Sequence, residues 1–236
     1  MPFPDEMAGG LAVVAYDRRW PGDFAALARR IQDALGPVAV RVSHVGSTSV
    51  PGLAAKDCID VQVEVQALEE SLITGCFGRI GFRLRPEPWN RAEPAPGGPC
   101  PKLLFAPPSG ERAGNIHVVK AASEAARRKL LFRDFLRAHD TARDALGDFK
   151  QRLAEMADDI YQYGQAKAGP TEILLIAAES WAGQTKWASP NSSWLNRIEA
   201  QLTALRYFAP DGTDRREWLS ASPSSSSTGS LPAPSN

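Results

Sequence analysis

Apolar positions in the first part of this chain change from a helical to a strand-like period. They recur at helical spacing from residue 24 onward, so a helix is predicted with Asp23 as its N-cap and Gly36-Pro37 as its end. Strand-like runs follow at 38–44 and 59–65. Only fourteen residues, including Pro and Gly, separate these runs, so antiparallel pairing is expected rather than a helical crossover.

The middle of the chain continues the predicted sheet. A helix is expected over 67–79 and a short strand over 82–85. Residues 86–100 contain five Pro and two Gly and are predicted to be a loop, of a length more typical of a functional flap than of a connector. Strands at 102–106 and 115–120 are expected to form a hairpin across Pro-Pro-Ser-Gly. The inward positions of the helix are predicted to be Leu68, Leu72, Cys76 and Ile80.

The period becomes helical again after residue 122. Ser123 is the predicted cap of a helix that ends near His139, with Leu131, Phe135 and Leu136 inward, and Thr141 is the predicted cap of the next helix. A third helix is expected over 160–181, interrupted near Gly169-Pro170. The apolar face of the second helix is predicted to comprise Ala142, Ala145, Leu146, Phe149, Leu153, Met156 and Ile160.

The order of these elements predicts an α+β fold with a mixed sheet, packed helices and a helical C-terminal half. One domain is expected over 11–183, and an additional helix and linker over 184–219, with the helix at 193–208. Residues 220–236 are rich in Ser, Pro and Gly and are predicted to be a disordered tail.

Composition favours a soluble protein of ordinary type. Hydrophobic residues make up 43% of the 236 positions, and Lys plus Arg equal Asp plus Glu at 27 each, so no global charge favours nucleic acid or a membrane. No apolar run reaches the roughly 18 residues of a membrane span, and the first residues do not resemble a signal peptide. Three widely spaced cysteines argue against disulfide and zinc frameworks and favour the cytoplasm.

The most informative stretch is 44–64, where a small, hydroxyl-rich loop joins two predicted strands. Backbone N–H groups and hydroxyls in such a loop can donate to phosphate oxygens, and glycine lets the backbone approach a ligand closely. Asp60 lies on the second strand and would be near the same point. The pattern indicates a site for a phosphate beside a divalent metal, although a tight turn and a buried acid with backbone donors would give the same pattern. The candidate loop residues are Gly46, Ser47, Thr48 and Ser49.

The same stretch resembles the signature of GrpB-like proteins, a family of the nucleotidyltransferase-fold superfamily that is also found fused behind some bacterial dephospho-CoA kinases. The resemblance is carried by His44-Val45-Gly46-Ser47-Thr48-Ser49-Val50-Pro51-Gly52-Leu53-Ala54-Ala55-Lys56 and Ile59-Asp60-Val61, and it covers about residues 14–182. Further matching segments are Tyr16-Asp17-Arg18-Arg19-Trp20-Pro21, Asn115-Ile116-His117-Val118-Val119, Leu131-Phe132-Arg133-Asp134-Phe135-Leu136-Arg137-Ala138-His139, Lys150 and Lys167.

The resemblance implies a nucleotidyltransferase-like palm and a specific chemistry. In active superfamily members the Gly-Ser loop holds a triphosphate, and three acids hold two Mg²⁺ ions that stabilise the attacking and leaving oxygens. Asp60 would then be the catalytic and metal-binding acid. This chain departs from that pattern, because Gln62 occupies the second acid position and the later strand offers Asn115, His117 and Lys120 rather than an acid.

Several other residues have both a functional and a structural interpretation. Lys56 would pair with Asp60, bind phosphate or lie at the surface. Arg133, on a basic stripe with Lys129 and Arg137, would face either a polyanion or solvent. The expected pocket residues are His44, Gln62 and His117, although a lone strand histidine is usually a hydrogen-bonded core residue. Trp89 would stack on a base or anchor its loop, Lys150 is expected to be exposed, and His139 is expected to cap a helix C-terminus.

Three functions are compatible with these patterns. The first is binding of a nucleotide or another phosphorylated small molecule at the Gly46-Ser47 loop, with Mg²⁺-dependent nucleotidyl transfer if the protein is an enzyme. The second is a non-catalytic ligand-binding or accessory module of the same fold, and the third is a protein that binds a partner through its helical half and tail. The acceptor, the base preference and the oligomeric state stay open.

Overall fold

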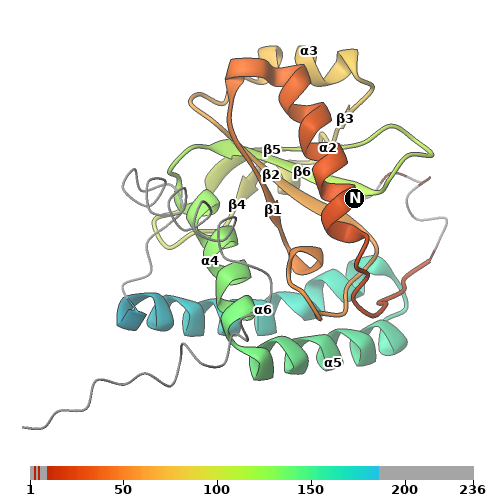
Figure 1. Ribbon diagram of the computed structural model, residues 1–236, viewed down its shortest axis with the longest axis vertical. Coiled ribbons are helices and arrows are strands. Elements are labelled where there is room, and N and C mark those ends of the chain that lie inside the picture. Colours follow the sequence, from red (N-terminus) through yellow and green to blue (C-terminus); the bar gives the residue numbers. More distant parts are fainter. Residues whose placement is uncertain (1–2, 4, 6–9, 186–236) are drawn as a thin grey trace, which may run out of the picture. The chain divides into compact units, whose positions relative to one another are not determined.

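The computed structural model describes residues 3, 5 and 10–185 (Figure 1). The helices are α2 (Trp20–Leu35), α3 (Glu70–Arg79), α4 (Glu124–Ala138), α5 (Asp140–Met156) and α6 (Ile160–Thr185), with 3₁₀ turns η1 (Gly36–Val38), η2 (Ser47–Ser49) and η3 (Pro88–Asn90). The strands are β1 (Ala39–Val45), β2 (Ile59–Val65), β3 (Arg83–Leu84), β4 (Ala92–Glu93), β5 (Cys100–Ala106) and β6 (Gly114–Lys120). The helix predicted at 193–208, the tail predicted at 220–236 and most of the 184–219 segment lie outside these residues.

The strands form one mixed sheet in the order β1-β2-β6-β5-β3, with β4 paired to β5. The predicted antiparallel pairing of β1 with β2 and the predicted β5–β6 hairpin are both confirmed. β2 and β6 are the parallel pair at the centre of the sheet. The expected α+β class, with a mixed sheet and a helical C-terminal half, is therefore correct.

Strand β2 separates two different surroundings because its side chains alternate between the faces of the sheet. Ile59, Val61 and Val63 are fully buried in the apolar core that also contains Trp20 and Ile31 of α2 and Phe77 of α3. Asp60 and Gln62 point to the opposite face, on which α4 packs, as the Gln62 hydrogen bond to Ala126 of α4 shows. We call this second face the site face.

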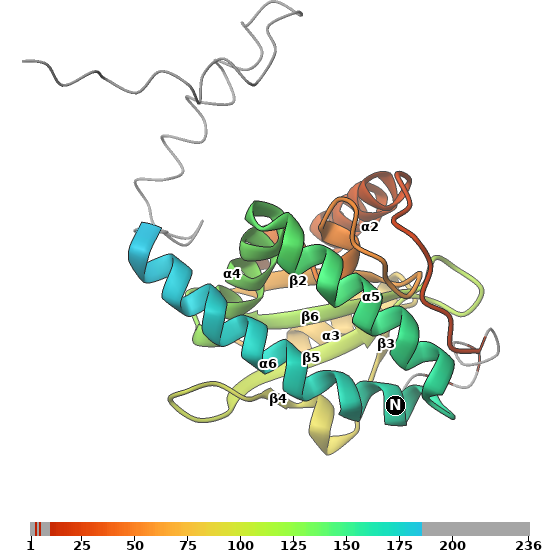
Figure 2. The ribbon, with the colours of Figure 1, turned by 90° about the horizontal axis from the view of Figure 1, so that it is seen from below.

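A second apolar cluster joins the segment after β1 to the C-terminal helices. Val50 and Leu53 pack with Leu131, Phe135 and Leu136 of α4, Leu146 of α5 and Leu175 of α6. The helices α5 and α6 run side by side below the sheet in Figure 1 and cross in front of it in Figure 2. The cluster therefore anchors three helices beside the loop that the sequence singles out. No helix in the described part of the chain is both long and apolar enough to span a bilayer.

Two predicted helix starts and one predicted break are wrong. Helix α2 begins at Trp20, before Asp23, and its Pro21 fits the first turn, where no N–H is needed. Helix α5 begins at Asp140, before Thr141. Helix α6 continues through Pro170, and the Thr171 hydroxyl donates to the Lys167 carbonyl at 2.8 Å. Tertiary packing of α6 against α4 and α5 outweighs the local cost of the proline. The Ser123 cap is confirmed by the bond from the Ala126 N–H at 3.3 Å.

Several predicted facings also differ from the structure. Leu72 is exposed, and α3 instead buries Ile73, Cys76 and Phe77. Met156 is 80% exposed, at the C-terminal end of α5. The segment 86–100 is not a plain loop, because it contains η3 and the short strand β4 and its last residue begins β5. Lys150, expected at the surface, is 2% exposed, and the site geometry explains its burial.

Candidate functional site

The strand register brings one end of the site face together. Asp60 of β2 lies opposite Val45 of β1 and Asn115 of β6, and Gln62 lies opposite His117. Since residues opposite each other on neighbouring strands share a face, Asp60, Asn115 and His117 point to the same side of the sheet. In the sequence Asp60 belongs to one motif and Asn115 and His117 to another, and the parallel β2–β6 pairing joins them.

Asp60 is a hydrogen-bonded carboxylate at this point. Its Oδ1 accepts from Asn115 Nδ2 at 3.0 Å and lies 3.6 Å from His117 Nε2. Burial raises the pKa of Asp60, but the His117 and Asn115 contacts and the positive charge of Lys167 outweigh burial and lower the pKa to about 2. The side chain remains 29% exposed. Asp60 is therefore ionised at neutral pH and accessible to solvent.

The predicted loop runs directly against this carboxylate. Gly46 has φ of +68°, and a Cβ there would overlap the Asp60 carboxylate and lie 2.8 Å from Asp60 Cβ. Glycine is thus required twice, by backbone conformation and by space. The Ser49 hydroxyl donates to the Gly46 carbonyl at 2.6 Å, and the Thr48 hydroxyl contacts His44 Nε2 at 3.0 Å. The half-buried Ser47 hydroxyl makes no hydrogen bond within residues 10–185.

His44 does not join this group. It lies opposite Val61, whose side chain belongs to the core on the α2 side, and its ring stacks on Phe24 at 4.6 Å between centroids. Burial lowers the pKa of His44 to about 4, with Asp60 opposing this effect and two arginines adding to it. The structure does not bring His44 and His117 into one pocket. His44 instead supports the loop through Thr48.

Glu93 is a site residue that sequence reasoning did not identify. It lies on β4, within the Pro-rich segment, and its Oε1 is 3.0 Å from Lys102 Nζ and 3.5 Å from His117 Nδ1, and pairs with Lys129. Burial raises the pKa of Glu93, but His117, Lys129 and Lys102 outweigh burial and hold the pKa well below its usual range. His117 therefore lies between two carboxylates, Asp60 and Glu93. A two-residue strand in a Pro-rich stretch has no periodicity that could have revealed it.

Three lysines from separate segments interact with one another, and two of them, Lys150 and Lys167, interact with Asp60. Lys56 follows the loop, Lys150 belongs to α5 and Lys167 belongs to α6; we call them the lysine cluster. Lys150 Nζ donates to the carbonyl of Ala54. Burial, together with the charges of Lys167 and Lys56, lowers the pKa of Lys150 to about 7, whereas Asp60 opposes this shift. Burial and Lys56 likewise lower the pKa of Lys167, against the pull of Asp60.

Glycine explains why Lys150 is buried. A Cβ at Gly147, one turn earlier on α5, would lie 3.6–3.8 Å from atoms of Leu53 and Ala54, so this part of α5 lies against the chain after the loop. The neighbouring turn then points Lys150 at the Ala54 carbonyl instead of into water. Burial of the amine follows from this close helix–loop contact.

Two arginines of the basic stripe of α4 contact the protein, although Arg137 is also exposed to solvent. Arg133 donates to the His44 carbonyl at 3.2 Å and to Asp134, and Arg137 donates twice to the Ser49 carbonyl, at 3.0 and 2.7 Å. These bonds hold both ends of the loop to α4. Direct contact of Arg133 with phosphate stays a prediction. The His139 interaction with the end of α4 is confirmed, since Nδ1 lies 2.8 Å from the Phe135 carbonyl.

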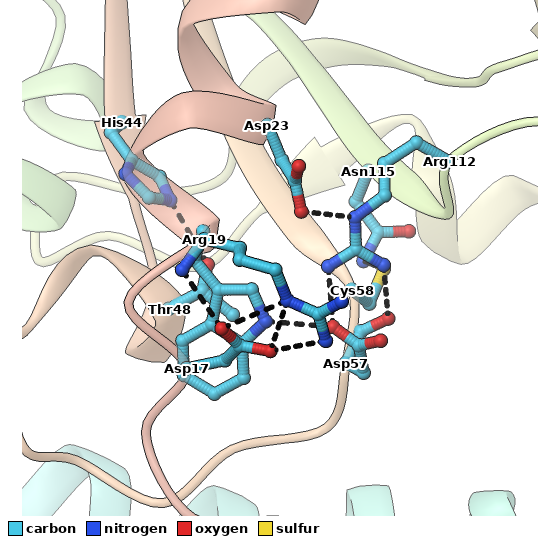
Figure 3. A network of polar contacts seen from close by, with 10 residues as sticks. Asp17, Arg19, Asp23, His44, Thr48, Asp57, Cys58, Arg112 and Asn115 are labelled. Atoms are coloured by element: carbon cyan, nitrogen blue, oxygen red, sulfur yellow. Dashed lines mark hydrogen bonds and ion pairs between the residues drawn. The ribbon is translucent and has the colours of Figure 1, made fainter.

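A network of ion pairs holds the chain that leads into β2 (Figure 3). Arg112 binds Asp23 at 2.8 Å and also binds Asp57, while the Trp20 indole donates to Asp57 at 2.7 Å. A separate pair joins Arg19 and Asp17. These contacts tie the start of α2 to the segment between Lys56 and Asp60. Asp23 lies in the first turn of α2 and pairs with Arg112 instead of capping the helix.

The residues do not fit a two-metal centre. Gln62, in the second acid position, is fully buried and donates to Glu64 at 3.3 Å and to the Ala126 carbonyl at 3.2 Å. Its Oε1 has no hydrogen-bond donor in the described residues, but it is a neutral oxygen where a hard cation prefers a charged one. Glu93 is already paired with two lysines. Across residues 3, 5 and 10–185, no three His, Cys, Asp or Glu side chains are placed to hold a metal ion.

Comparison with known proteins gives a consistent family. The family model described as GrpB protein matches residues 10–174. A UPF0157 protein of Streptomyces coelicolor is 35% identical over 187 residues, covering 78% of this chain and 89% of that protein. A UPF0157 protein of Halalkalibacterium halodurans is 32% identical over 174 residues, covering 72% and 83%. A dephospho-CoA kinase of Mycolicibacterium paratuberculosis is 30% identical over 193 residues, which cover 74% of this chain but only 47% of the kinase.

A solved structure of the same family agrees with this assignment. The crystal structure of the conserved protein GrpB from Enterococcus faecalis matches with a TM-score of 0.59 and 26% identity, over 72% of this chain and 99% of that chain. The Cid1 RNA terminal uridylyl transferase matches with a TM-score of 0.43 and 11% identity over 60% of this chain and 42% of that chain. The second likeness is too weak to transfer any site or activity.

Proposed function

Because this chain belongs to the GrpB family, we propose that it binds a nucleotide or another phosphorylated small molecule beside Asp60. The observation that carries the proposal is that the Gly46 loop, Lys150 and Lys167 meet at one partly exposed carboxylate, with Lys56 beside the two lysines. A phosphate group would be stabilised by this excess of positive charge and by donors from the loop. The three cysteines form no disulfide within the described residues, and we place this binding in the cytoplasm.

Two surface grooves suit a phosphate less well. A groove of about 510 Å³ lies between α5 and α6, and its lining contains no charged side chain. A second groove, of about 560 Å³, carries Asp148 and Glu155 against a single Arg152. The first offers no cation for a phosphate and the second is net acidic. The positive charge near Asp60 therefore decides the choice of site.

Ligand binding without turnover is the form of the proposal that the side chains favour. Two-metal nucleotidyl transfer requires an acid where Gln62 is buried and hydrogen-bonded. Incorporation of label from α-labelled nucleoside triphosphates into any acceptor would separate transfer from binding, and Asp60→Asn would then abolish incorporation. The relatedness to part of a dephospho-CoA kinase motivates adding CoA-type ligands to the tests.

A thermal-shift screen of nucleotides, CoA-type compounds and phosphorylated metabolites tests the proposal, each with Mg²⁺ and with EDTA. We expect at least one phosphate-bearing compound to raise the melting temperature, since a ligand that binds only the folded state stabilises it. The dephosphorylated form of the same compound is the control and should raise it less. If no phosphate-bearing compound raises the melting temperature under either condition, the proposed function is wrong.

Ser47→Ala sharpens the screen by removing one hydroxyl of the loop. Because this hydroxyl has no protein partner in the described residues, we expect the melting temperature of the free protein to stay unchanged. Affinity for the stabilising compound should fall by about 3-fold to 10-fold, the effect of one lost hydrogen bond. Ser71→Ala, on the exposed side of α3, is the matched control and should bind like the wild type. Equal affinity of both variants would remove the loop from the binding site.

A further inference from the structure

We propose that the lysine cluster and the Tyr163 hydroxyl form the binding site of the phosphate group, and that this phosphate site needs no divalent cation. This inference rests on the proposed function. Ammonium groups would thus take the place that metal ions occupy in two-metal sites. The phosphate would be bound by α5, α6 and the chain after the loop, with a chemistry that differs from the one the Asp60 motif implies.

The geometry of the cluster is centred on one aromatic ring. Tyr163, in the first turn of α6, is 1% exposed. Lys56 Nζ lies 5.9 Å from its ring centroid and Lys167 Nζ lies 5.6 Å from it, so two ammonium groups from distant segments lie near the same ring. Lys150 of α5 interacts electrostatically with both of these lysines and with Asp60. The chain after the loop and α6 therefore bring two ammonium groups to one ring, and the α5 amine of Lys150 interacts with both.

The Tyr163 hydroxyl is the second, independent observation. It is buried and has no hydrogen-bond partner among the described residues. Buried hydroxyls nearly always have a partner, and an unpaired one costs about 1–3 kcal/mol. Burial also raises the pKa of Tyr163 to about 12, so the group is a donor at neutral pH. A phosphate oxygen would accept this hydrogen bond at the place where the ammonium groups gather.

Charge balance favours an anion over a metal ion in this volume. Asp60 is one carboxylate against three lysines, and its Oδ1 already accepts from Asn115. Glu93, the other carboxylate near His117, is paired with Lys102 and Lys129. A divalent cation would add positive charge beside Lys56, Lys150 and Lys167, whereas a phosphate would remove the repulsion between them. Lysine binds phosphate as a point charge and does not depend on a preset coordination geometry.

The test compares ATP and inorganic pyrophosphate binding to the full chain in EDTA and in Mg²⁺, by calorimetry and thermal shift. We expect binding in EDTA to be at least as tight as binding in Mg²⁺, because free phosphates carry more negative charge. Lys167→Gln and Lys150→Met should weaken binding by about 10-fold to 100-fold, the loss of one charge-assisted bond. Lys120→Gln is the matched control, since Lys120 is exposed at the far end of β6, and it should bind like the wild type.

The melting temperatures of the ligand-free variants show whether a substitution removes the phosphate site or unfolds the protein. Removal of one ammonium group relieves repulsion, so the ligand-free Lys167→Gln protein should melt no lower than the wild type. Lys150→Met also loses the hydrogen bond to the Ala54 carbonyl and should melt slightly lower. Tyr163→Phe should weaken pyrophosphate binding by about 3-fold to 10-fold without lowering the melting temperature, because the lost hydroxyl has no protein partner.

The outcomes also separate this inference from the proposed function. Binding that occurs only with Mg²⁺ would support the proposed function but contradict a metal-free phosphate site. Variants of the lysine cluster that fold normally and bind in EDTA like the wild type would also contradict the proposed phosphate site. An absence of binding by every phosphate-bearing compound in both conditions would instead contradict the proposed function itself.

Discussion

The two faces of the central sheet share the same strands but differ in chemistry: one is apolar and the other carries buried charge. On the α2–α3 face, Ile59, Val61 and Val63 meet apolar side chains such as Ile31 and Phe77, and burial of apolar area stabilises the fold at roughly 25 cal/mol per Å². On the site face, the intervening residues are polar, and Asp60 interacts with lysines of α4, α5 and α6. Apolar burial on one face stabilises the fold, whereas buried charge on the other face destabilises it. The comparison indicates that repulsive groups are tolerated where a ligand can compensate them.

The largest loss of stability is expected for Gly46→Ala, which adds a methyl group beside Asp60 on the site face. The substitution strains a residue at φ +68° and pushes a Cβ into the Asp60 carboxylate. We expect a loss of roughly 2–4 kcal/mol of unfolding free energy by urea denaturation and loss of phosphate-ligand binding.

Gly36→Ala is the matched control for Gly46→Ala. Gly36 also has a positive φ, +53°, but a Cβ there meets nothing within 4 Å. The cost should stay at roughly 1–2 kcal/mol, the conformational part alone, and ligand binding should be unchanged. Equal costs at the two glycines would show that the contact with Asp60 is not what requires Gly46.

The two faces also differ in how far their residues could be predicted from sequence. The apolar period of β2 predicts the core face directly, and the signature around Gly46 and Asp60 predicts where the loop meets the strand. Glu93 could not be predicted, because its strand is two residues long and its partners Lys102, His117 and Lys129 are distant in sequence. The sequence predicts an exposed Lys150, since the packing of α5 at Gly147 that buries this residue cannot be deduced from the sequence pattern.

Alkaline pH should reveal the cost of buried charge on the site face. In the unfolded chain the Lys150 amine keeps its proton up to about pH 10.4, whereas in the folded protein its pKa is about 7. Between these values the unfolded state binds more protons, so unfolding free energy should rise with pH. Relative to Lys150→Met, the wild type should gain roughly 3–4 kcal/mol between pH 7 and pH 10, measured by urea denaturation. A constant difference across this range would show that Lys150 titrates normally in the folded protein.

Acidic pH should give a smaller effect, from the histidine on the opposite side of β1. His44 stacks on Phe24 and its pKa is lowered to about 4 from an ordinary 6.5, mainly by burial. The unfolded chain therefore takes up a proton between pH 6.5 and pH 4 that the folded protein does not, and unfolding free energy should fall by roughly 2 kcal/mol as the pH falls through this range. His44→Gln, which can still bond to Thr48, should lose this part of the acid sensitivity while the alkaline rise from Lys150 persists. If His44→Gln also removed the alkaline rise, the two faces would be coupled through the loop, and the separation of a stabilising face from a binding face would not hold.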